Sequence, residues 1–282
     1  MNILHLHSTT RPWSISNRAN NLSKSLIKLG HTSTVIPIAS LGNKIPQSDI
    51  IHLHTLGVIP KVYPRLSNRR WIFEVVSKRS IKPYRLNFSG AAGCILKNLR
   101  LKIDYKCPTF YIPNGIDPKV FNSKIRIGWV GNQKEANLEY KGVHLIEQAV
   151  VLLKAKYPKM DIKFVLDPGK YPLHILSHTE VAKFYKSLDV SICASIAEGC
   201  SNTVLESLAC GIPVITAPVG IYKELEHLSF VTVCKRTVDG IFEALDGVLK
   251  PKIDTHLGLL EYTWLQIAKQ YEGVYNAILG NA

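Results

Sequence analysis

The feature that most constrains this chain is a strand–helix–strand alternation that runs through its first part and then starts again. Residues 2–7 are a short apolar segment, and apolar side chains then recur at helical spacing from Asn20 to Gly30, a residue type that commonly ends helices. Residues 31–38 follow as a second predicted strand. Such units build parallel sheets, because strands that run in the same direction need a crossover between them. Two further strands are predicted, at residues 49–54 and 70–76.

A cluster of turn residues divides the chain. Residues 112–118 read Ile-Pro-Asn-Gly-Ile-Asp-Pro, and their two prolines and Asn-Gly pair are strong turn signals. The charge balance changes in the same region, since residues 1–124 hold 19 Lys and Arg against 4 Asp and Glu, whereas residues 125–282 hold 16 against 17. We therefore place a domain boundary near residues 118–124 and expect two α/β sheet domains.

The alternation restarts beyond this boundary. Helices are predicted over residues 143–156 and 179–187, the second with Thr179 as its N-cap, and an apolar stripe in the last 20 residues predicts a final helix. The strands that alternate with them are predicted at residues 125–130, 162–166, 190–194 and 213–216.

The composition excludes several classes of protein. With 46% hydrophobic and 20% charged residues, the 282-residue chain can bury a core and is not disordered. No apolar run approaches the roughly 20 residues that span a bilayer, and the start does not resemble a signal peptide. The six cysteines form no C-x-x-C pair, so we expect reduced thiols, a cytoplasmic protein and no metal site.

Residues 195–213 carry the chemistry. A strand is expected to end near Ser195 and a helix to begin at Ser201 or Asn202, and a helix N-terminus at the carboxyl end of a parallel strand suits a phosphate group. Glu198 and Glu206 flank this point, and their carboxylates can accept hydrogen bonds from sugar hydroxyls. Taken singly, either glutamate is also compatible with a purely structural role.

A cation for the phosphates is available nearby. Lys141 directly precedes the predicted helix at residues 143–156, so its ammonium group is a candidate for binding a diphosphate.

At these residues the sequence resembles a known family, the retaining glycosyltransferases of family 4 with the GT-B fold (glycosyl transferases group 1), in a compact form. Glu198 and Glu206 are separated by seven residues and followed by Leu-Ala-Cys-Gly-Ile-Pro-Val-Ile, as in the family signature. The other matching segments are residues 112–117 with Phe121, residues 128–131 leading to Lys141-Gly142, residues 184–190, and a final helix with Trp264 and Tyr275.

The resemblance implies a fold with two Rossmann-like parallel-sheet domains facing a cleft. Residues 1–120 would bind the acceptor, residues 121–260 would bind a nucleotide-diphosphate sugar, and residues 261–282 would form a helix that crosses back to the first domain. The implied reaction is retaining transfer of a hexosyl or pentosyl group by front-face attack, in which positioning and electrostatic stabilisation do most of the work. No cofactor or metal is required, and no obligate protein partner is inferred.

The resemblance also assigns roles to residues. Glu198 would bind the donor sugar and Lys141 the leaving phosphates, as the catalytic pair, while Glu206 would bind the ribose. The other residues assigned to donor binding are Gly199, Cys200, Ser201, Asn202, Thr203, Gly131 and Asn132. The chain departs from the family pattern at Trp13-Ser14, where a glycine pair is common, and at Asn132, where a basic residue is common.

The excess charge points to an anionic acceptor. Residues 61–106 hold 12 Lys and Arg against 2 Asp and Glu, with aromatic residues between them, a pattern that suits nucleic acid. The candidate acceptor-binding residues are Arg69, Arg70, Lys78, Arg79, Lys82 and Arg85. The leading candidate acceptor is a hydroxymethylated pyrimidine in DNA, flipped out of the helix.

Two alternatives remain open. One is transfer to a lipid-linked or cell-envelope glycan at an anionic membrane surface, with the protein peripheral on the inner face. The other is a non-enzymatic nucleic-acid-binding relative of the family.

Overall fold

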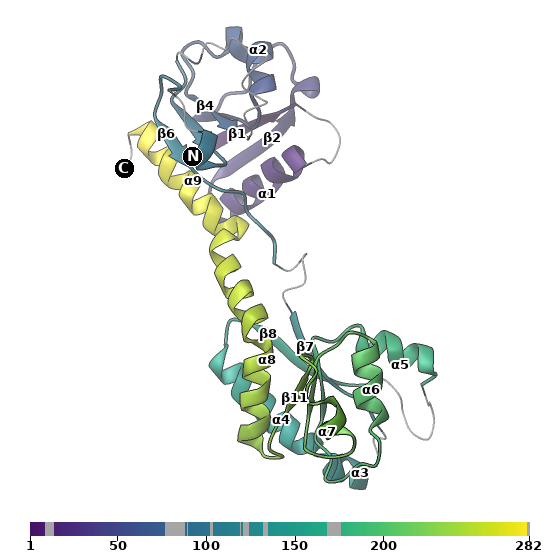
Figure 1. Cartoon of the computed structure of the whole chain (residues 1–282). Helices are drawn as coiled ribbons and strands as arrows, with labels where there is room; N and C mark the ends of the chain where they lie inside the picture. Colours follow the sequence, from purple (N-terminus) through teal and green to yellow (C-terminus); the bar gives the residue numbers. More distant parts are fainter. Residues whose placement is uncertain are drawn as a thin grey trace. The chain divides into compact units, whose positions relative to one another are not determined.

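The protein consists of two compact units. The structure, a computed structural model, describes all residues except 9–13, 77–87, 89, 102–103, 119, 121–123, 132–134, 168–175 and 281–282. Unit 1 comprises Met1–Val120 and Gly258–Ala282, and unit 2 comprises Phe121–Leu257. The last helix of the chain therefore belongs to the first unit (Figure 1).

Unit 1 is built on a six-stranded parallel sheet in the order β2-β1-β3-β4-β5-β6. The four strands predicted from the apolar pattern are all present, and two short strands follow them. The strands are β1 (Asn2–His7), β2 (Thr32–Pro37), β3 (Ile50–Leu53), β4 (Trp71–Val75), β5 (Gly93–Leu96) and β6 (Thr109–Tyr111).

Each face of this sheet has its own cover. On one face Leu4, Leu53 and Phe73 pack with the connection after β3, which contains the short helix α2 (Ile59–Val62). On the other face α1 (Ser14–Lys28) and α9 (Trp264–Leu279) lie side by side, and Leu22 and Ile267 belong to one buried cluster (Figure 1). Helix α1 begins six residues earlier than the apolar pattern predicts, because its first turns are polar.

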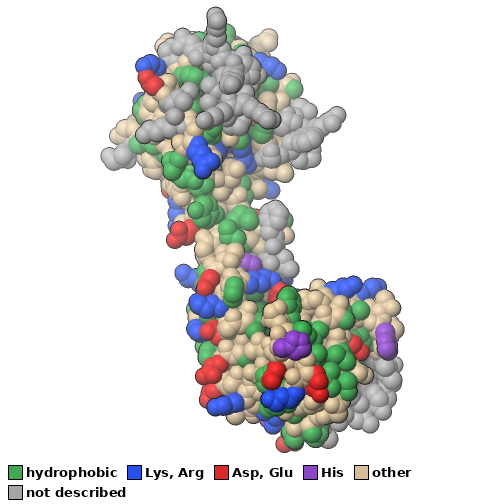
Figure 2. Space-filling view, viewed as in Figure 1, with side chains coloured by type: hydrophobic (Ala, Val, Ile, Leu, Met, Phe, Trp, Pro, Cys, Tyr) green, Lys and Arg blue, Asp and Glu red, His purple; other side chains and the backbone are tan. Residues whose placement is uncertain are grey.

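The excess positive charge belongs to unit 1. Its two segments hold 19 Lys and Arg against 6 Asp and Glu, whereas unit 2 holds 16 against 15. On the face shown in Figure 2, the described part of unit 1 has few Asp and Glu side chains, whereas both signs of charge are mixed on unit 2.

Unit 2 contains a five-stranded parallel sheet in the order β11-β10-β9-β7-β8. Its strands are β7 (Lys124–Trp129), β8 (Asp161–Leu166), β9 (Val190–Cys193), β10 (Val214–Thr216) and β11 (Val231–Val233). Its helices are α3 (Glu135–Tyr140), α4 (Val143–Lys156), α5 (His178–Tyr185), α6 (Asn202–Ala209), α7 (Tyr222–Leu225) and α8 (Val238–Leu259).

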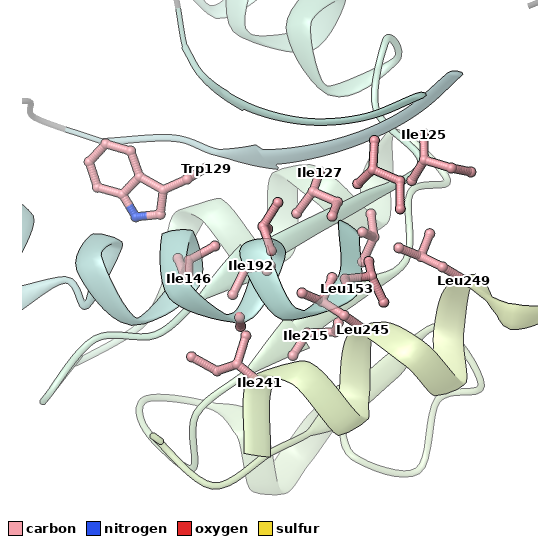
Figure 3. Packing of buried hydrophobic residues seen from close by; sticks show 14 of the residues in the cluster. Ile125, Ile127, Trp129, Ile146, Leu153, Ile192, Ile215, Ile241, Leu245 and Leu249 are labelled. Atoms are coloured by element: carbon pink, nitrogen blue, oxygen red, sulfur yellow. The ribbon is translucent and has the colours of Figure 1, made fainter. Parts of the chain in front are cut away.

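The core of unit 2 lies between its sheet and helices α4 and α8. Ile127 of β7 packs with Ile146 and Leu153 of α4 and with Ile241 and Leu245 of α8 (Figure 3). Because α6 packs with Val204 in a separate buried cluster together with Cys193 and Val214, α4 and α6 cover opposite faces of the sheet.

The prediction of two parallel-sheet α/β domains is confirmed, and α4 has the predicted limits. The N-cap predicted for the next helix was wrong. Ser177, not Thr179, caps α5: its hydroxyl accepts the Glu180 N–H at 3.3 Å, and the Glu180 carboxylate accepts the Ser177 N–H at 2.8 Å. No helix in the described part of the chain is long and apolar enough to cross a membrane.

Candidate active site

The candidate site lies at the carboxyl edge of the sheet in unit 2. All five strands are parallel, so the segments that follow them meet at this edge. The chain leaves β7 toward β8 on one side and continues from β9 toward β10 on the other, with α4 and α6 on opposite faces. The crevice between β7 and β9 is therefore the topological switch point, where sheets of this type bind ligands.

Lys141 and Glu198 meet at this switch point. The Lys141 ammonium lies 2.5 Å from Glu198 Oε1, and the Ser195 hydroxyl donates to the same oxygen at 2.6 Å. Burial alone would raise the pKa of the Glu198 carboxyl, but the hydrogen bonds from Lys141 and Ser195 outweigh it and hold that pKa below its ordinary value. The side chain of Lys141 is 31% exposed and that of Glu198 is 17% exposed, so both remain accessible to a ligand.

The turn that carries Lys141 is packed tightly against the end of β9. Gly142 has a left-handed backbone (φ 72°), and a Cβ atom there would lie 2.4 Å from the Ala194 carbonyl oxygen. The Ile196 N–H donates to the Tyr140 carbonyl at 3.0 Å, and the Tyr140 hydroxyl donates to the Ala197 carbonyl at 3.2 Å. These contacts fix the ammonium group beside the loop that carries Glu198.

Helix α6 begins where the sequence predicts, with Ser201 as N-cap residue and Asn202 as first helical residue. The Ser201 hydroxyl makes no capping hydrogen bond and instead pairs with the Thr203 hydroxyl at 2.9 Å. The side chain of Ser201 thus leaves the first N–H groups of the helix uncapped. Gly199 and Cys200, in the loop before the helix, are exposed.

Glu206 lies one turn into α6 and is half-buried. Burial raises the pKa of the Tyr185 hydroxyl, and the charge of Glu206 and a hydrogen bond to it raise that pKa further. Tyr185 thus lies close to Glu206, and its hydroxyl donates to the Thr203 carbonyl of the same helix at 3.2 Å. The structure brings Lys141 and Glu198 into direct contact, and it places Glu206 on the helix that follows them.

Gly131 lies just beyond β7, as predicted, and Asp167 holds it in place. Asp167 follows β8, and its Oδ2 accepts the Gly131 N–H at 2.9 Å. Sequence reasoning missed Asp167, although an acidic residue directly after a predicted strand was an available signal. Asn132 lies outside the described residues.

Of the six predicted acceptor residues, only Arg69 and Arg70 lie in the described part of the chain. Arg69 and Arg70 precede β4 and therefore lie at the amino edge of the sheet in unit 1, opposite the carboxyl ends of the strands. Arg69 donates to the Pro46 carbonyl at 2.8 Å and to the Ser48 hydroxyl at 3.2 Å, a structural role. This placement does not support their assignment to an acceptor site. Lys78, Arg79, Lys82 and Arg85 lie outside the described residues.

A buried polar cluster, which sequence reasoning missed, lies beneath the sheet of unit 1. At its centre is the Glu74 carboxylate, which is 1% exposed. Arg18 lies 3.3 Å from its Oε2, Lys97 lies 3.3 Å from its Oε1, and the Tyr271 hydroxyl donates to Oε1 at 2.5 Å. Burial opposes ionisation of Glu74, but Lys97, followed by His54, outweighs it and holds the pKa well below its ordinary value.

Three histidines complete this cluster. His52 Nε2 and His54 Nδ1 lie 3.2 and 3.4 Å from Glu74 Oε1, His5 Nδ1 lies 2.9 Å from His54 Nε2, and His52 Nδ1 lies 2.8 Å from the Tyr275 hydroxyl. Burial lowers the pKa of all three histidines, for His52 to about 3, so they are neutral near pH 7. His5 lies on β1, His52 lies on β3, and His54 directly follows β3. These two strands are neighbours at the switch point of the sheet in unit 1.

The histidines do not make a convincing metal centre. One ligand atom from each of His5, His52 and His54 lies within 4.8 Å of the others. However, the cluster already contains the cations Arg18 and Lys97 against a single carboxylate, Glu74. A divalent cation would add to a buried positive charge, which is costly. We therefore assign the cluster to the attachment of α1 and α9 to the sheet.

Comparison with known proteins agrees with the motifs. Residues 124–250, most of unit 2, match the family described as glycosyl transferases group 1, so the predicted resemblance is confirmed for this unit. One component of the human phosphatidylinositol N-acetylglucosaminyltransferase is 24% identical over 203 residues, which cover 59% of this chain. The match spans only 40% of that relative's length. Both comparisons are with glycosyltransferases.

Solved structures also resemble the chain over its length. A glycosyltransferase from Rickettsia africae has 13% identity and a TM-score of 0.43, covering 100% of this chain and 99% of its own. Sucrose-phosphate synthase from Thermosynechococcus elongatus has 14% identity and a TM-score of 0.40, covering 100% of both chains. HepE from Anabaena, solved with UDP, has 12% identity and a TM-score of 0.37, covering 98% of this chain and 100% of its own.

Proposed function

We propose that this protein is a retaining glycosyltransferase that takes its donor, a nucleotide-diphosphate sugar, in unit 2. The observation that carries the proposal is the contact between Lys141 and Glu198 at the switch point, directly before the uncapped N-terminus of α6. This arrangement supplies a cation, a carboxylate and a helix N-terminus that the Ser201 side chain does not cap, all within one small region. A sugar diphosphate needs all three, because it presents both anionic phosphates and neutral hydroxyls.

Donor binding exchanges one ion pair for another. Lys141 would leave the Glu198 carboxylate and bind the phosphate oxygens, and the freed carboxylate would accept a hydrogen bond from a sugar hydroxyl. During transfer, the bond between the anomeric carbon and the phosphate oxygen breaks, and a bond to the acceptor oxygen forms on the same face. The acceptor proton passes to the departing phosphate, whose charge Lys141 stabilises. Glu206, one turn into α6, is our candidate for the ribose hydroxyls.

For the acceptor we propose a hydroxyl group on a polyanion, with a hydroxymethylated pyrimidine in DNA as the leading candidate. The support is the charge of unit 1, where 19 Lys and Arg stand against 6 Asp and Glu. The name of the human relative contains that of an anionic lipid, phosphatidylinositol, which becomes the other arm of the test.

The donor proposal is tested by screening common nucleotide sugars for release of the nucleoside diphosphate. We expect release with one donor and a loss of about 100-fold or more in kcat for Lys141→Ala and Glu198→Ala. Lys154→Ala is the matched control, because Lys154 is exposed in the last turn of α4 and far along the helix from Lys141. Full activity in both site variants would refute the assignment, as would no release with any donor and a broad acceptor panel.

The acceptor proposal is tested separately with the active donor. Hydroxymethylated duplex DNA and vesicles containing phosphatidylinositol are offered in parallel at several salt concentrations. Transfer to the DNA, weakened as the salt concentration rises, is the expected result. Transfer only to the lipid would replace our leading candidate, and transfer to a neutral acceptor alone would refute the argument from charge.

A further inference from the structure

Arg236 binds three backbone carbonyls at the edge of the candidate site. It lies three residues beyond the end of β11, and its Nε donates to the Ala194 carbonyl at 2.8 Å. Its Nη2 approaches the carbonyls of Glu139 and Tyr140 at 3.2 and 3.5 Å. One guanidinium group therefore joins the segment after β9 to the turn that precedes Lys141.

The Glu139 and Tyr140 carbonyls also accept the Gly142 and Ile196 N–H groups, each at 3.0 Å, so Arg236 adds a charged donor to carbonyls that already have one partner. Glu139 and Tyr140 are the last two residues of α3, and the final carbonyls of a helix have no N–H partner within the helix itself. A cation at this end also interacts favourably with the helix dipole. Ala194 directly follows β9 and starts the loop that leads to Glu198. Arg236 thus stabilises the two backbone segments whose side chains form the Lys141–Glu198 pair.

We propose that Arg236 is a positioning residue for Lys141, an inference that rests on the donor-binding role proposed for unit 2. It holds the turn at residues 139–142 against the end of β9, so that the Lys141 ammonium lies where the leaving phosphates of the donor bind. The fixed fork of a guanidinium suits this role, because its separate N–H groups reach acceptors on two segments at once.

Other contacts in the turn explain why small displacements matter. Gly142 already approaches the Ala194 carbonyl so closely that a Cβ atom would not fit, and the Tyr140 carbonyl also accepts the Ile196 N–H. Without Arg236, the Ala194 and Glu139 carbonyls lose a charged donor, and the attachment of the turn to the end of β9 is weakened. A displacement of about 1 Å at a catalytic group can cost on the order of 100-fold in rate.

The first experiment needs no substrate. Hydrogen exchange of the Ile196 amide, whose N–H is bonded to the Tyr140 carbonyl, reports on the contact between the turn and the loop. In Arg236→Gln we expect this exchange to rise at least 10-fold, while amides of the β7 strand stay protected. Lys235→Gln is the matched control, since Lys235 is the exposed neighbour and also loses one charge. Unchanged exchange at Ile196 would overturn the proposal.

The second experiment asks whether Arg236 acts through Lys141. With the active donor, we expect Arg236→Gln to lower kcat/KM by about 10- to 100-fold, Arg236→Lys to recover part of this, and Lys235→Gln to have little effect. In a Lys141→Ala background the Arg236 substitution should have almost no additional effect. Effects that multiply fully in the double variant would overturn the proposal, because Arg236 would then act independently of Lys141.

The two experiments separate this inference from the proposed function. If the wild-type protein releases no nucleoside diphosphate from any donor, the proposed function fails, and the exchange experiment still decides whether Arg236 holds the turn. If the protein is active but the two substitutions act independently, the function stands and the positioning role fails.

Discussion

Replacing Glu74 by Gln tests the assignment of the buried cluster in unit 1 as a polar attachment of helices to the sheet. Glu74 lies between Arg18 of α1, Lys97 beyond β5 and Tyr271 of α9, so one carboxylate binds groups from three elements outside its own strand. Glutamine keeps the shape of the side chain and removes its charge. Arg18 and Lys97 are only 10% and 5% exposed, and they would then be buried without a counterion.

The expected cost is large for a single atom change. Breaking a buried ion pair by removing one partner costs about 3–5 kcal/mol, because the remaining charge is left uncompensated. A domain of this kind has a total stability of about 5–15 kcal/mol, so the loss is a sizeable fraction. Burial lowers the pKa of Lys97 in spite of Glu74, and the variant should lower it further. A lysine whose pKa is lowered in the folded state destabilises the protein below its ordinary pKa, so the defect should lessen as the pH is raised toward that ordinary value.

Urea denaturation followed by fluorescence and by hydrogen exchange of unit 1 measures this cost. The informative second variant combines Glu74→Gln with Lys97→Met, which removes one of the two uncompensated charges and should restore part of the lost stability and flatten the pH dependence. A loss below about 1 kcal/mol for Glu74→Gln at pH 7, with an unchanged urea dependence, would refute the reasoning. It would mean that water already solvates the cluster.

Three further outcomes are expected. The pKa of His52 is lowered to about 3 by burial. Below pH 6.5 the unfolded chain therefore binds a proton at His52 that the folded protein does not bind. For His52 alone, the free energy of unfolding should fall by about 3 kcal/mol between pH 6.5 and pH 4, which urea denaturation at the two pH values measures. Gly142→Ala should cost about 2 kcal/mol or more in urea denaturation, because of its left-handed backbone and the blocking Ala194 carbonyl; a neutral effect would contradict the packing described for this turn. Cys200 is exposed, whereas Cys94, Cys193 and Cys234 are buried, so iodoacetamide should label Cys200 before these three, as followed by peptide mass spectrometry. A bound nucleoside diphosphate should slow the labelling of Cys200. Equal labelling with and without the nucleotide would count against a donor site at this loop.

The regular elements of this fold could be predicted because each depends on a local pattern. The apolar runs of β1, β7 and β9 and the periodicity of α4 and α9 are visible in short windows of sequence. The same pattern fails where the local signal contradicts the structure. Helix α8 contains Pro251 in its interior, a residue that normally interrupts a helix, and it is nevertheless continuous from Val238 to Leu259.

The candidate site likewise contains some residues that could be predicted from the sequence and others that could not. Glu198, Glu206 and the start of α6 were visible, because an N-cap after a strand and its flanking carboxylates lie within a dozen residues. The role of Arg236 could not be predicted, because the three carbonyl groups that it binds belong to residues 42 to 97 positions away in the sequence. The cluster around Glu74 left only a faint trace: Ile is followed two residues later by a titratable residue on β1, β3 and β4, at His5, His52 and Glu74. Only the parallel sheet shows that these positions share a face.

The net charge of +14 illustrates why a count of charges overstates the surface available to an anion. Unit 1 carries nearly all of the excess, but Arg18 and Lys97 are buried against Glu74. Arg65 donates to the Gly42 and Lys61 carbonyls, and Arg69 donates to the Pro46 carbonyl, so both are engaged by backbone carbonyls of unit 1. An acceptor polyanion therefore meets fewer free cations than the sequence suggests. Only cations that reach phosphates release counterions on binding. Acceptor binding should therefore weaken less with salt than it would if all 19 basic residues of the unit contacted phosphates.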